Sequence, residues 1–228
     1  MGCPWDRFLG ATVGTCEPDV CGWVVHPAET ASAQVYFLVS VLLWWRSRNT
    51  DQDRATRYLP ALIAIVGTGA LFFHMSMAAI FQTLDLVAIY PLAAVLVGAT
   101  LAYRYPRVER SFPLVITTMV VSGSALPFFG LWVGFAGLAL AAAIVAIIGL
   151  RISAGPATDL RRAFALLLLG VILLALDHGQ LGCVSGTLEH VIQPHAWWHA
   201  LSGASFIYLY RYLAGLARMG AGADPSVT

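Results

Sequence analysis

The sequence predicts an all-α membrane protein: a bundle of seven transmembrane helices with its N terminus outside and its C terminus in the cytoplasm. Of the 228 residues, 59% are hydrophobic and only 11% are charged. The mean hydropathy of +0.76 exceeds what a water-soluble domain of this length can bury in one core. Seven apolar segments follow one another along the chain, and arginines gather in every second connection between them.

Each of the seven segments is long enough to cross a bilayer, which takes roughly 20 helical residues. We expect the spans at residues 27–46, 57–76, 83–103, 112–129, 131–150, 161–177 and 194–214. A tight turn around Gly130 separates the fourth span from the fifth. Residues 1–219 are expected to form a single domain in which 1–26 is an outer N-terminal segment, and residues 220–228 are expected to form a disordered tail.

The positions of the arginines orient the bundle. All thirteen basic residues are arginine, and twelve of them lie in alternate connections or near the C-terminal end. The intervening connections at 77–82, around 130 and at 178–193 carry none. Because cytoplasmic loops are enriched in basic residues, this pattern places the N terminus outside. The exclusive use of arginine suggests a GC-rich, bacterial genome, hence an inner or plasma membrane. The net charge of +1 gives by itself no sign of a nucleic-acid partner, and we expect none.

The motif with the clearest chemistry is His195-Ala-Trp-Trp-His199, at the start of the last span. Two imidazoles four residues apart lie on one face of a helix, so both can bind one metal ion. His74, at the outer end of the second span, lies on the same side of the membrane, where an ionisable group is costly unless it has a function. Three imidazoles with one open position are typical of a catalytic zinc site. The alternative for His74 is a packing residue hydrogen-bonded to backbone.

Two carboxylates lie near these histidines. Asp85 follows His74 by eleven residues across a short outer turn, so the side chains of two antiparallel helices can meet. A carboxylate there either ligates the metal or holds a water beside it, and the alternative is a helix N-cap. We expect Asp177, at the outer end of the sixth span, to be structural and to contact a ligating histidine. Trp197 and Trp198 are typical interfacial anchors.

These motifs resemble those of the alkaline ceramidases, seven-helix membrane amidases that cleave ceramide to a sphingoid base and a fatty acid. The resemblance covers nearly the whole chain and rests on Cys16-Glu17, Pro27-Ala-Glu29-Thr30, Phe73-His74-Met75 with Asp85, and His195-Ala-Trp-Trp-His199-Ala-Leu-Ser-Gly. It implies zinc held by His74, His195 and His199, with Asp85 as the general base that positions the water. It also implies a ceramide-like membrane lipid as substrate, reached from the outer leaflet.

The resemblance further implies a disulfide between Cys16 and Cys183. All four cysteines lie on the outer side, where disulfides persist, but connectivity cannot be read from sequence. Free thiols and a bond between Cys16 and Cys21 therefore stay open as alternatives.

The sequence departs from the family pattern one helical turn before His74. The family has a serine there that faces the oxyanion, and this chain has Ala70. Thr68 and Ser76 point to other faces of the helix, so we expect neither to replace the missing hydroxyl. Loss of one oxyanion donor costs on the order of 10² to 10³ in rate. Ala70 therefore indicates a slower natural enzyme, a different acyl substrate or an engineered inactivating change, and the sequence does not choose among these.

A second departure concerns a structural calcium ion, which the resemblance implies at acids matching Glu17, Asp19 and Glu29. Gly14 stands where the family has a leading aspartate, and the spacing to Glu29 is one residue longer. Calcium takes about six to eight oxygen ligands. The alternative is a hydrated acidic surface with Glu29 capping the first span.

The sequence therefore predicts a zinc-dependent intramembrane hydrolase that cleaves the amide of ceramide-like lipids on the non-cytoplasmic side. One alternative is a receptor-like seven-helix zinc protein that binds lipids with little or no turnover. It would resemble the progestin and adiponectin receptor group, which lacks the Cys-Glu start and the Trp-Trp pair. Another is a transporter with Asp85 and His74 as a relay, although the ionisable groups cluster at one membrane face and form no path across.

Overall fold

The chain is helical throughout most of its length in a computed structural model that describes residues 2–48, 54–109, 111–152 and 154–221. Within these ranges the elements are α1 (Pro27–Ser32), α2 (Gln34–Ser47), α3 (Arg54–Ser76), α4 (Ala79–Arg104), α5 (Pro106–Glu109), α6 (Phe112–Ala125), the 3-10 helix η1 (Leu126–Phe129), α7 (Leu131–Gly149), α8 (Ala154–His178), the 3-10 helix η2 (Gly186–Leu188) and α9 (Pro194–Ala221). The described part contains no strand, only an isolated bridge between Gly10 and Ala78.

All seven expected spans are helical, with differences at their ends. The first is divided at Ala33 into α1 and α2, and the fourth comprises α6 and η1. Helix α8 begins at Ala154 instead of residue 161, and α9 continues past residue 214. Because α9 ends at Ala221, the tail expected at 220–228 does not begin at residue 220. Residues 222–228 lie outside the described part.

Composition alone identifies fewer spans than the seven helical segments. Among the described residues, Thr56–Ser76, Ala79–Arg104 and Leu131–Gly149 are long and apolar enough to cross a membrane, and Pro113–Phe129 is a shorter apolar helix. Helix α8 carries charged residues near both ends, and α9 begins with the polar histidine motif. Charged and polar residues near the ends of α8 and at the start of α9 therefore lower the apolar character of these two helices.

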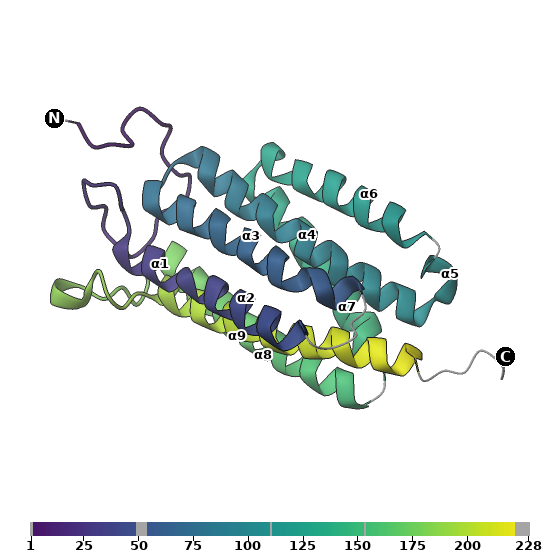
Figure 1. Cartoon of the computed structure of the whole chain (residues 1–228). Coiled ribbons are helices and arrows are strands. Elements are labelled where there is room, and N and C mark those ends of the chain that lie inside the picture. The colour runs from purple at the N-terminus through teal and green to yellow at the C-terminus, as the bar shows by residue number, and fades with distance from the viewer. Residues whose placement is uncertain (1, 49–53, 110, 153, 222–228) are drawn as a thin grey trace.

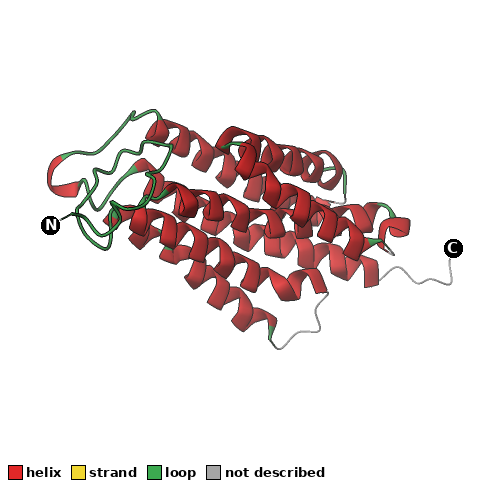
Figure 2. Cartoon of the chain, turned by 90° about the horizontal axis from the view of Figure 1, so that it is seen from above, coloured by secondary structure: helices red, strands yellow, loops and turns green. Residues whose placement is uncertain are grey.

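The long helices lie side by side with roughly aligned axes (Figures 1 and 2). Helix α3 packs between α2 and α4, α6 and α7 cover the other side of α4, and α8 packs along α9. The N-terminal segment and the connection between α8 and α9 lie together at one end of the bundle, whereas α5 and the end of α9 lie at the opposite end. The arginine-rich connections and the histidine motif are therefore at opposite ends.

Hydrogen-bonded hydroxyls join the helices inside the apolar core. The Tyr36 hydroxyl on α2 is 2.7 Å from Ser202 Oγ on α9, and Thr100 Oγ1 on α4 is 2.9 Å from the Tyr212 hydroxyl on α9. All four side chains are buried. Because no water competes in such a core, each pair satisfies groups that would otherwise cost free energy.

The N-terminal segment is fastened to the ends of α3 and α4 by backbone hydrogen bonds. The amides of Val25 and His26 donate to the carbonyls of Met75 and His74 at 3.0 and 3.1 Å. These two carbonyls belong to the last turn of α3, where a helix leaves acceptors without internal partners. The segment therefore completes the end of the helix that carries His74.

Two disulfides also fix this segment. Cys3 is bonded to Cys21, which closes the segment on itself, and Cys16 is bonded to Cys183, which attaches it to the connection after α8. The second bond is the one that the resemblance implies. The alternatives of free thiols and of a bond between Cys16 and Cys21 are wrong, and the bond between Cys3 and Cys21 was not expected.

Gly123 lets α6 approach α4 closely, and this contact can be tested by mutation. A Cβ added at Gly123 would lie 2.3 Å from Cδ1 of the buried Tyr90, whose hydroxyl donates to the Gly134 carbonyl at 2.6 Å. Because the ring would have to shift, we expect Gly123→Ala to lower the free energy of unfolding by about 1–3 kcal/mol. Thermal unfolding in detergent measures the effect. Gly155→Ala is the control, since nothing lies within 4 Å of its added Cβ; an equal loss in both variants would contradict the packing argument.

Candidate metal centre

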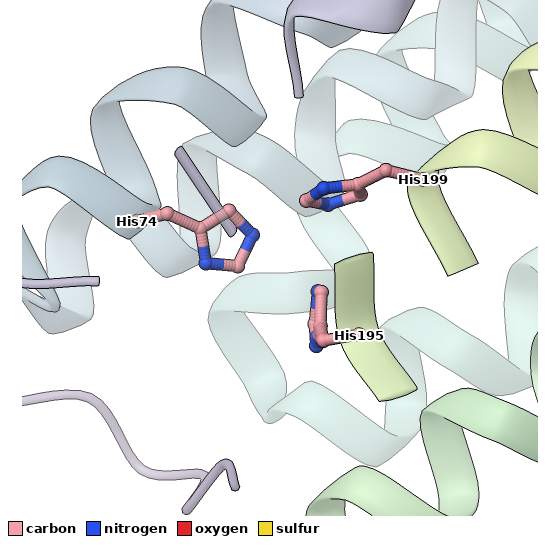
Figure 3. Close-up of side chains that lie close together, drawn as sticks. All are labelled: His74, His195 and His199. Atoms are coloured by element: carbon pink, nitrogen blue, oxygen red, sulfur yellow. The ribbon is translucent and has the colours of Figure 1, made fainter. Parts of the chain in front are cut away.

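Three imidazoles converge between α3 and α9, near the end of the bundle that holds the N-terminal segment (Figure 3). His74, His195 and His199 offer nitrogen atoms that all lie within 4.8 Å of one another. Their ring centroids are 4.7, 4.9 and 4.9 Å apart. Zinc–nitrogen bonds of about 2.0–2.1 Å at tetrahedral angles place the centroids of neighbouring rings about 5 Å apart. The triangle of rings therefore has the size of a zinc site with three histidines.

Each of the three rings presents its Nδ1 to an oxygen acceptor. The pairs are His74 with Glu29 Oε2 at 2.8 Å, His195 with Asp177 Oδ2 at 3.1 Å and His199 with Ser32 Oγ at 2.8 Å. A carboxylate only accepts, and the Ser32 hydroxyl already donates to the Glu29 carbonyl at 3.0 Å, so its oxygen accepts as well. His195 and His199 therefore carry a proton on Nδ1 and keep the Nε2 lone pair for a shared ligand. The His74 contact with Glu29 is close but does not have hydrogen-bond geometry.

The three rings are almost fully buried, with exposed fractions of 0%, 4% and 2% for His74, His195 and His199. In the described part of the chain, both ring nitrogens of His74 are buried and have no hydrogen-bond partner. A buried nitrogen without a partner costs free energy, and a metal ion at the centre of the triangle would satisfy it. The donor set, the spacing and the orphaned nitrogen all fit a bound zinc ion.

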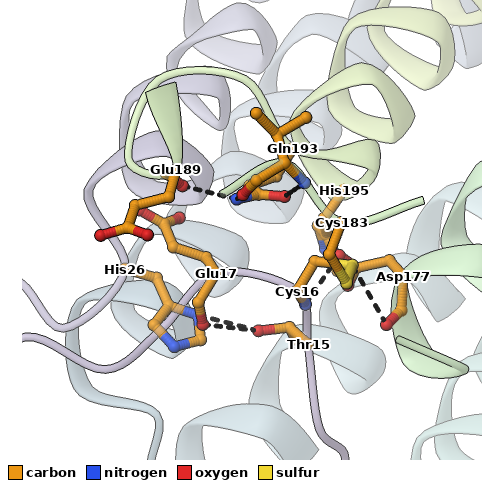
Figure 4. Close-up of a disulfide and its surroundings, with 10 residues drawn as sticks. Thr15, Cys16, Glu17, His26, Asp177, Cys183, Glu189, Gln193 and His195 are labelled. Atoms are coloured by element: carbon orange, nitrogen blue, oxygen red, sulfur yellow. Dashed lines mark hydrogen bonds and ion pairs between the residues drawn. A yellow bond between two sulfur atoms is a disulfide. The ribbon is translucent and has the colours of Figure 1, made fainter. Parts of the chain in front are cut away.

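Asp177 connects the centre to the disulfide, as Figure 4 shows. Its carboxylate is fully buried; Oδ2 accepts from His195, and Oδ1 accepts from the Cys16 amide at 3.1 Å. The bond between Cys16 and Cys183 holds that amide in place. The expected contact of Asp177 with a ligating histidine is present, and through it α8, α9 and the N-terminal segment meet at one carboxylate.

Asp85 lies on α4, facing α3. Its carboxylate is not part of the group that the three histidines form, but it is close enough to His195 to interact electrostatically. A Cβ added at Gly69 would lie 2.9 Å from the Asp85 Cα and 3.3 Å from its Oδ1, so the glycine lets this carboxylate come against α3. The N-cap alternative is wrong, because α4 begins at Ala79 with Ala78 as its N-cap.

No neighbouring side chain on α3 replaces the serine hydroxyl that Ala70 lacks. Ala70 is buried in the core. Thr68 Oγ1 donates to the Ala64 carbonyl at 2.9 Å, and Ser76 Oγ donates to the Phe72 carbonyl at 2.8 Å. Both hydroxyls thus bond the backbone of their own helix, as expected from their positions.

The acids proposed for calcium have other partners. Glu17 is buried, and its two oxygens accept from the amides of Ala28 and Glu29 at 2.8 and 2.9 Å, so Glu17 and not Glu29 caps α1. Glu17, Asp19 and Glu29 do not form a group of metal ligands among the described residues. Because calcium takes about six to eight oxygens, this arrangement does not fit it. The alternative of hydrated surface acids is wrong for Glu17 and Glu29, which are both buried.

His26 lies between two of these acids and was not singled out by any sequence motif. The ring is buried, with Nε2 2.7 Å from Asp19 Oδ1 and Nδ1 3.0 Å from Glu29 Oε2. Burial lowers the pKa of His26, but the hydrogen bond and charge of Glu29, followed by those of Asp19, raise it above its ordinary value. No sequence motif singled out Ser32 either, because the function of a single polar residue on a helix is not visible until its spatial neighbour is known.

The tryptophan pair divides between two environments. Trp197 is 55% exposed and points away from the bundle, as an interfacial anchor does. Trp198 is partly buried and packs against α8, where a Cβ added at Gly170 would lie 2.7 Å from its Cε3. Only Trp197 therefore has the exposure expected of an anchor.

The fold and the centre define a helical protein with apolar spans and a buried histidine cluster able to hold a metal ion. A family model described as Ceramidase matches residues 11–226, which is nearly the whole chain. The chain belongs to the ceramidase family. No curated protein matches it.

Replacing Asp177 tests whether its carboxylate holds the metal centre in order. We expect Asp177→Asn to weaken zinc binding about 10–100-fold, because His195 loses the charged acceptor at its Nδ1. Competition with a chromophoric chelator measures the affinity on purified, zinc-loaded protein. Asp159→Asn is the control on the same helix, since Asp159 pairs with Arg162 and Arg211 at 3.6 and 3.3 Å. A wild-type chain without zinc, or equal affinity in both variants, would contradict the assignment.

Proposed function

We propose that the protein is a zinc-dependent intramembrane amidase that cleaves ceramide-like lipids to a sphingoid base and a fatty acid. The observation that carries the proposal is the buried triangle of His74, His195 and His199, whose Nε2 atoms are free to bind a metal. Membership of the ceramidase family supports ceramide hydrolysis as the reaction. The apolar surroundings suit a substrate that arrives from the membrane.

The chain supplies a division of roles for amide hydrolysis. A zinc ion held by the three histidines would lower the pKa of a water to about 7 and polarise the amide carbonyl. Asp85 holds the attacking water and accepts its proton as the new C–O bond forms. The same carboxyl returns a proton to the nitrogen as the C–N bond breaks, which releases the amine and the fatty acid. Glu29, Asp177 and Ser32 keep the imidazoles in place.

Ala70 makes the proposed enzyme slower than a relative with serine at this place. The oxyanion that forms from the carbonyl has one hydrogen-bond donor fewer, and neither Thr68 nor Ser76 offers another. An oxyanion donor is worth on the order of 10² to 10³ in rate.

We also propose that all seven helical segments cross the membrane, with the N terminus and the metal centre on the non-cytoplasmic side of the plasma membrane. The opposite placement of the N-terminal segment and the end of α9 supports an odd number of crossings. The arginines near the α5 end support its cytoplasmic location.

The proposed reaction is tested by incubating detergent-purified protein with N-acyl sphingoid bases of several chain lengths and measuring released fatty acid by mass spectrometry. We expect Asp85→Asn to reduce release at least about 10²-fold, since general-base catalysis contributes 10²–10⁴. We expect Ala70→Ser to raise release about 10-fold or more, because a donor is restored. Ala64→Ser adds a hydroxyl to the same helix away from His74 and should leave the rate unchanged.

Absence of fatty-acid release would separate this proposal from its alternatives. If zinc is bound and neither the wild-type chain nor Ala70→Ser releases fatty acid, the amidase proposal fails and the receptor-like lipid-binding protein takes its place. Release from Asp85→Asn at the wild-type rate would remove Asp85 from the mechanism and leave the reaction standing.

The orientation is tested with a reporter enzyme that is active only outside the cytoplasm. Fused after Met219, the reporter should be inactive, because the arginine-rich end faces the cytoplasm. Fused to the connection at 178–193, it should be active. Activity of the fusion after Met219 would reverse the orientation and place the metal centre inside.

A further inference from the structure

A buried imidazole lies between two carboxylates just outside the metal centre. His26 Nε2 is 2.7 Å from Asp19 Oδ1, and Nδ1 is 3.0 Å from Glu29 Oε2. Thr15 Oγ1 also lies 3.3 Å from Nδ1. The imidazole ring therefore bridges the two acids.

This ring is connected to the metal centre through Glu29. The Glu29 carboxylate is fully buried, and its Oε2 contacts both His26 Nδ1 and, at 2.8 Å, His74 Nδ1. The His26 amide also donates to the His74 carbonyl at 3.1 Å. Because a buried polar group needs partners, the contact with His26 keeps the Glu29 carboxylate directed at His74.

The same arrangement explains why the acids do not fit calcium. Asp19 Oδ1 and Glu29 Oε2 are used by the His26 ring, and the Glu17 oxygens are used by the amides at the start of α1. Gly14 supplies no carboxylate, and a Cβ added there would already lie 3.4 Å from Gln180 Nε2. The imidazole ring occupies the position between the carboxylates that a divalent cation would need.

We propose that the His26 ring is the built-in bridge of this junction: it takes the place of a divalent metal between Asp19 and Glu29, and through Glu29 it orients His74. The second part rests on the proposed zinc centre, whereas the first does not. His26 is a positioning residue, because it acts on the metal ligand through Glu29 and touches no reacting atom.

The first experiment measures thermal unfolding of the zinc-loaded protein with excess calcium and with a calcium-selective chelator. We expect the same unfolding temperature for the wild-type chain in both conditions. His26→Asp replaces the imidazole with a third carboxylate, so its unfolding temperature should be lower and should rise when calcium is added. A calcium-dependent rise in the wild-type chain would overturn the proposal that His26 takes the place of the metal.

The second experiment replaces zinc with cobalt and compares visible spectra, which report the geometry at the metal. His26→Gln is expected to alter the cobalt spectrum and to raise the zinc dissociation constant roughly tenfold, as loss of an outer partner of a ligand does. The milder Asp19→Asn should change the spectrum in the same direction if His26→Gln does not fold.

His190→Gln is the matched control: His190 Nδ1 contacts Glu17 Oε1 at 3.0 Å, and its connection to His74 runs through Glu17 and the Glu29 amide, not through the Glu29 carboxylate. An unchanged spectrum and zinc affinity in both His26→Gln and Asp19→Asn would overturn the positioning role. Neither experiment requires turnover of a lipid. If the calcium and cobalt experiments give the expected results but no lipid amide is cleaved, only the proposed function is contradicted.

Discussion

The metal centre depends on the acceptors that fix the Nδ1 atoms of its three histidines. Glu29 and Ser32 come from α1 and Asp177 from α8. Asp177 and Ser32 accept from the Nδ1 atoms of His195 and His199, and Glu29 Oε2 lies 2.8 Å from the Nδ1 of His74. Inside an apolar bundle an imidazole cannot exchange a poor partner for water, so a misplaced acceptor leaves a buried polar atom unsatisfied. The same contacts that stabilise the rings therefore aim their Nε2 atoms at one point.

The N-terminal segment precedes every span, yet the centre is incomplete without it. It completes the end of α3 with backbone amides, caps α1 with Glu17 and meets Asp177 through the Cys16 amide. The disulfide to Cys183 ties this segment to the connection that leads into α9. Because two of the three histidine partners are held by contacts to this segment, a disturbance of the segment is transmitted to the histidines. Residues outside the long helices are thus part of the site.

The sequence allowed the bundle and the ligand set to be predicted but not the partners of the ligands. Apolar length located all seven helices, and the spacing of His195 and His199 indicated a shared face. The helix ends in α8 and α9 were missed because charged and polar residues continue these helices beyond the apolar stretch. Ser32, His26 and the bond between Cys3 and Cys21 depend on contacts between separate segments, which no spacing rule encodes. The role of Asp85 stays a prediction.

Ala70 bears on whether the family reaction can survive the loss of a hydroxyl. Rate depends on interactions that are stronger in the transition state than in the ground state, and an oxyanion donor is one of these. The ligands and their acceptors, in contrast, act on the ground state and the transition state alike. In the proposed mechanism, alanine at residue 70 would therefore lower the rate of turnover while the histidines and their acceptors stay in place. Binding and turnover are expected to separate at this one residue.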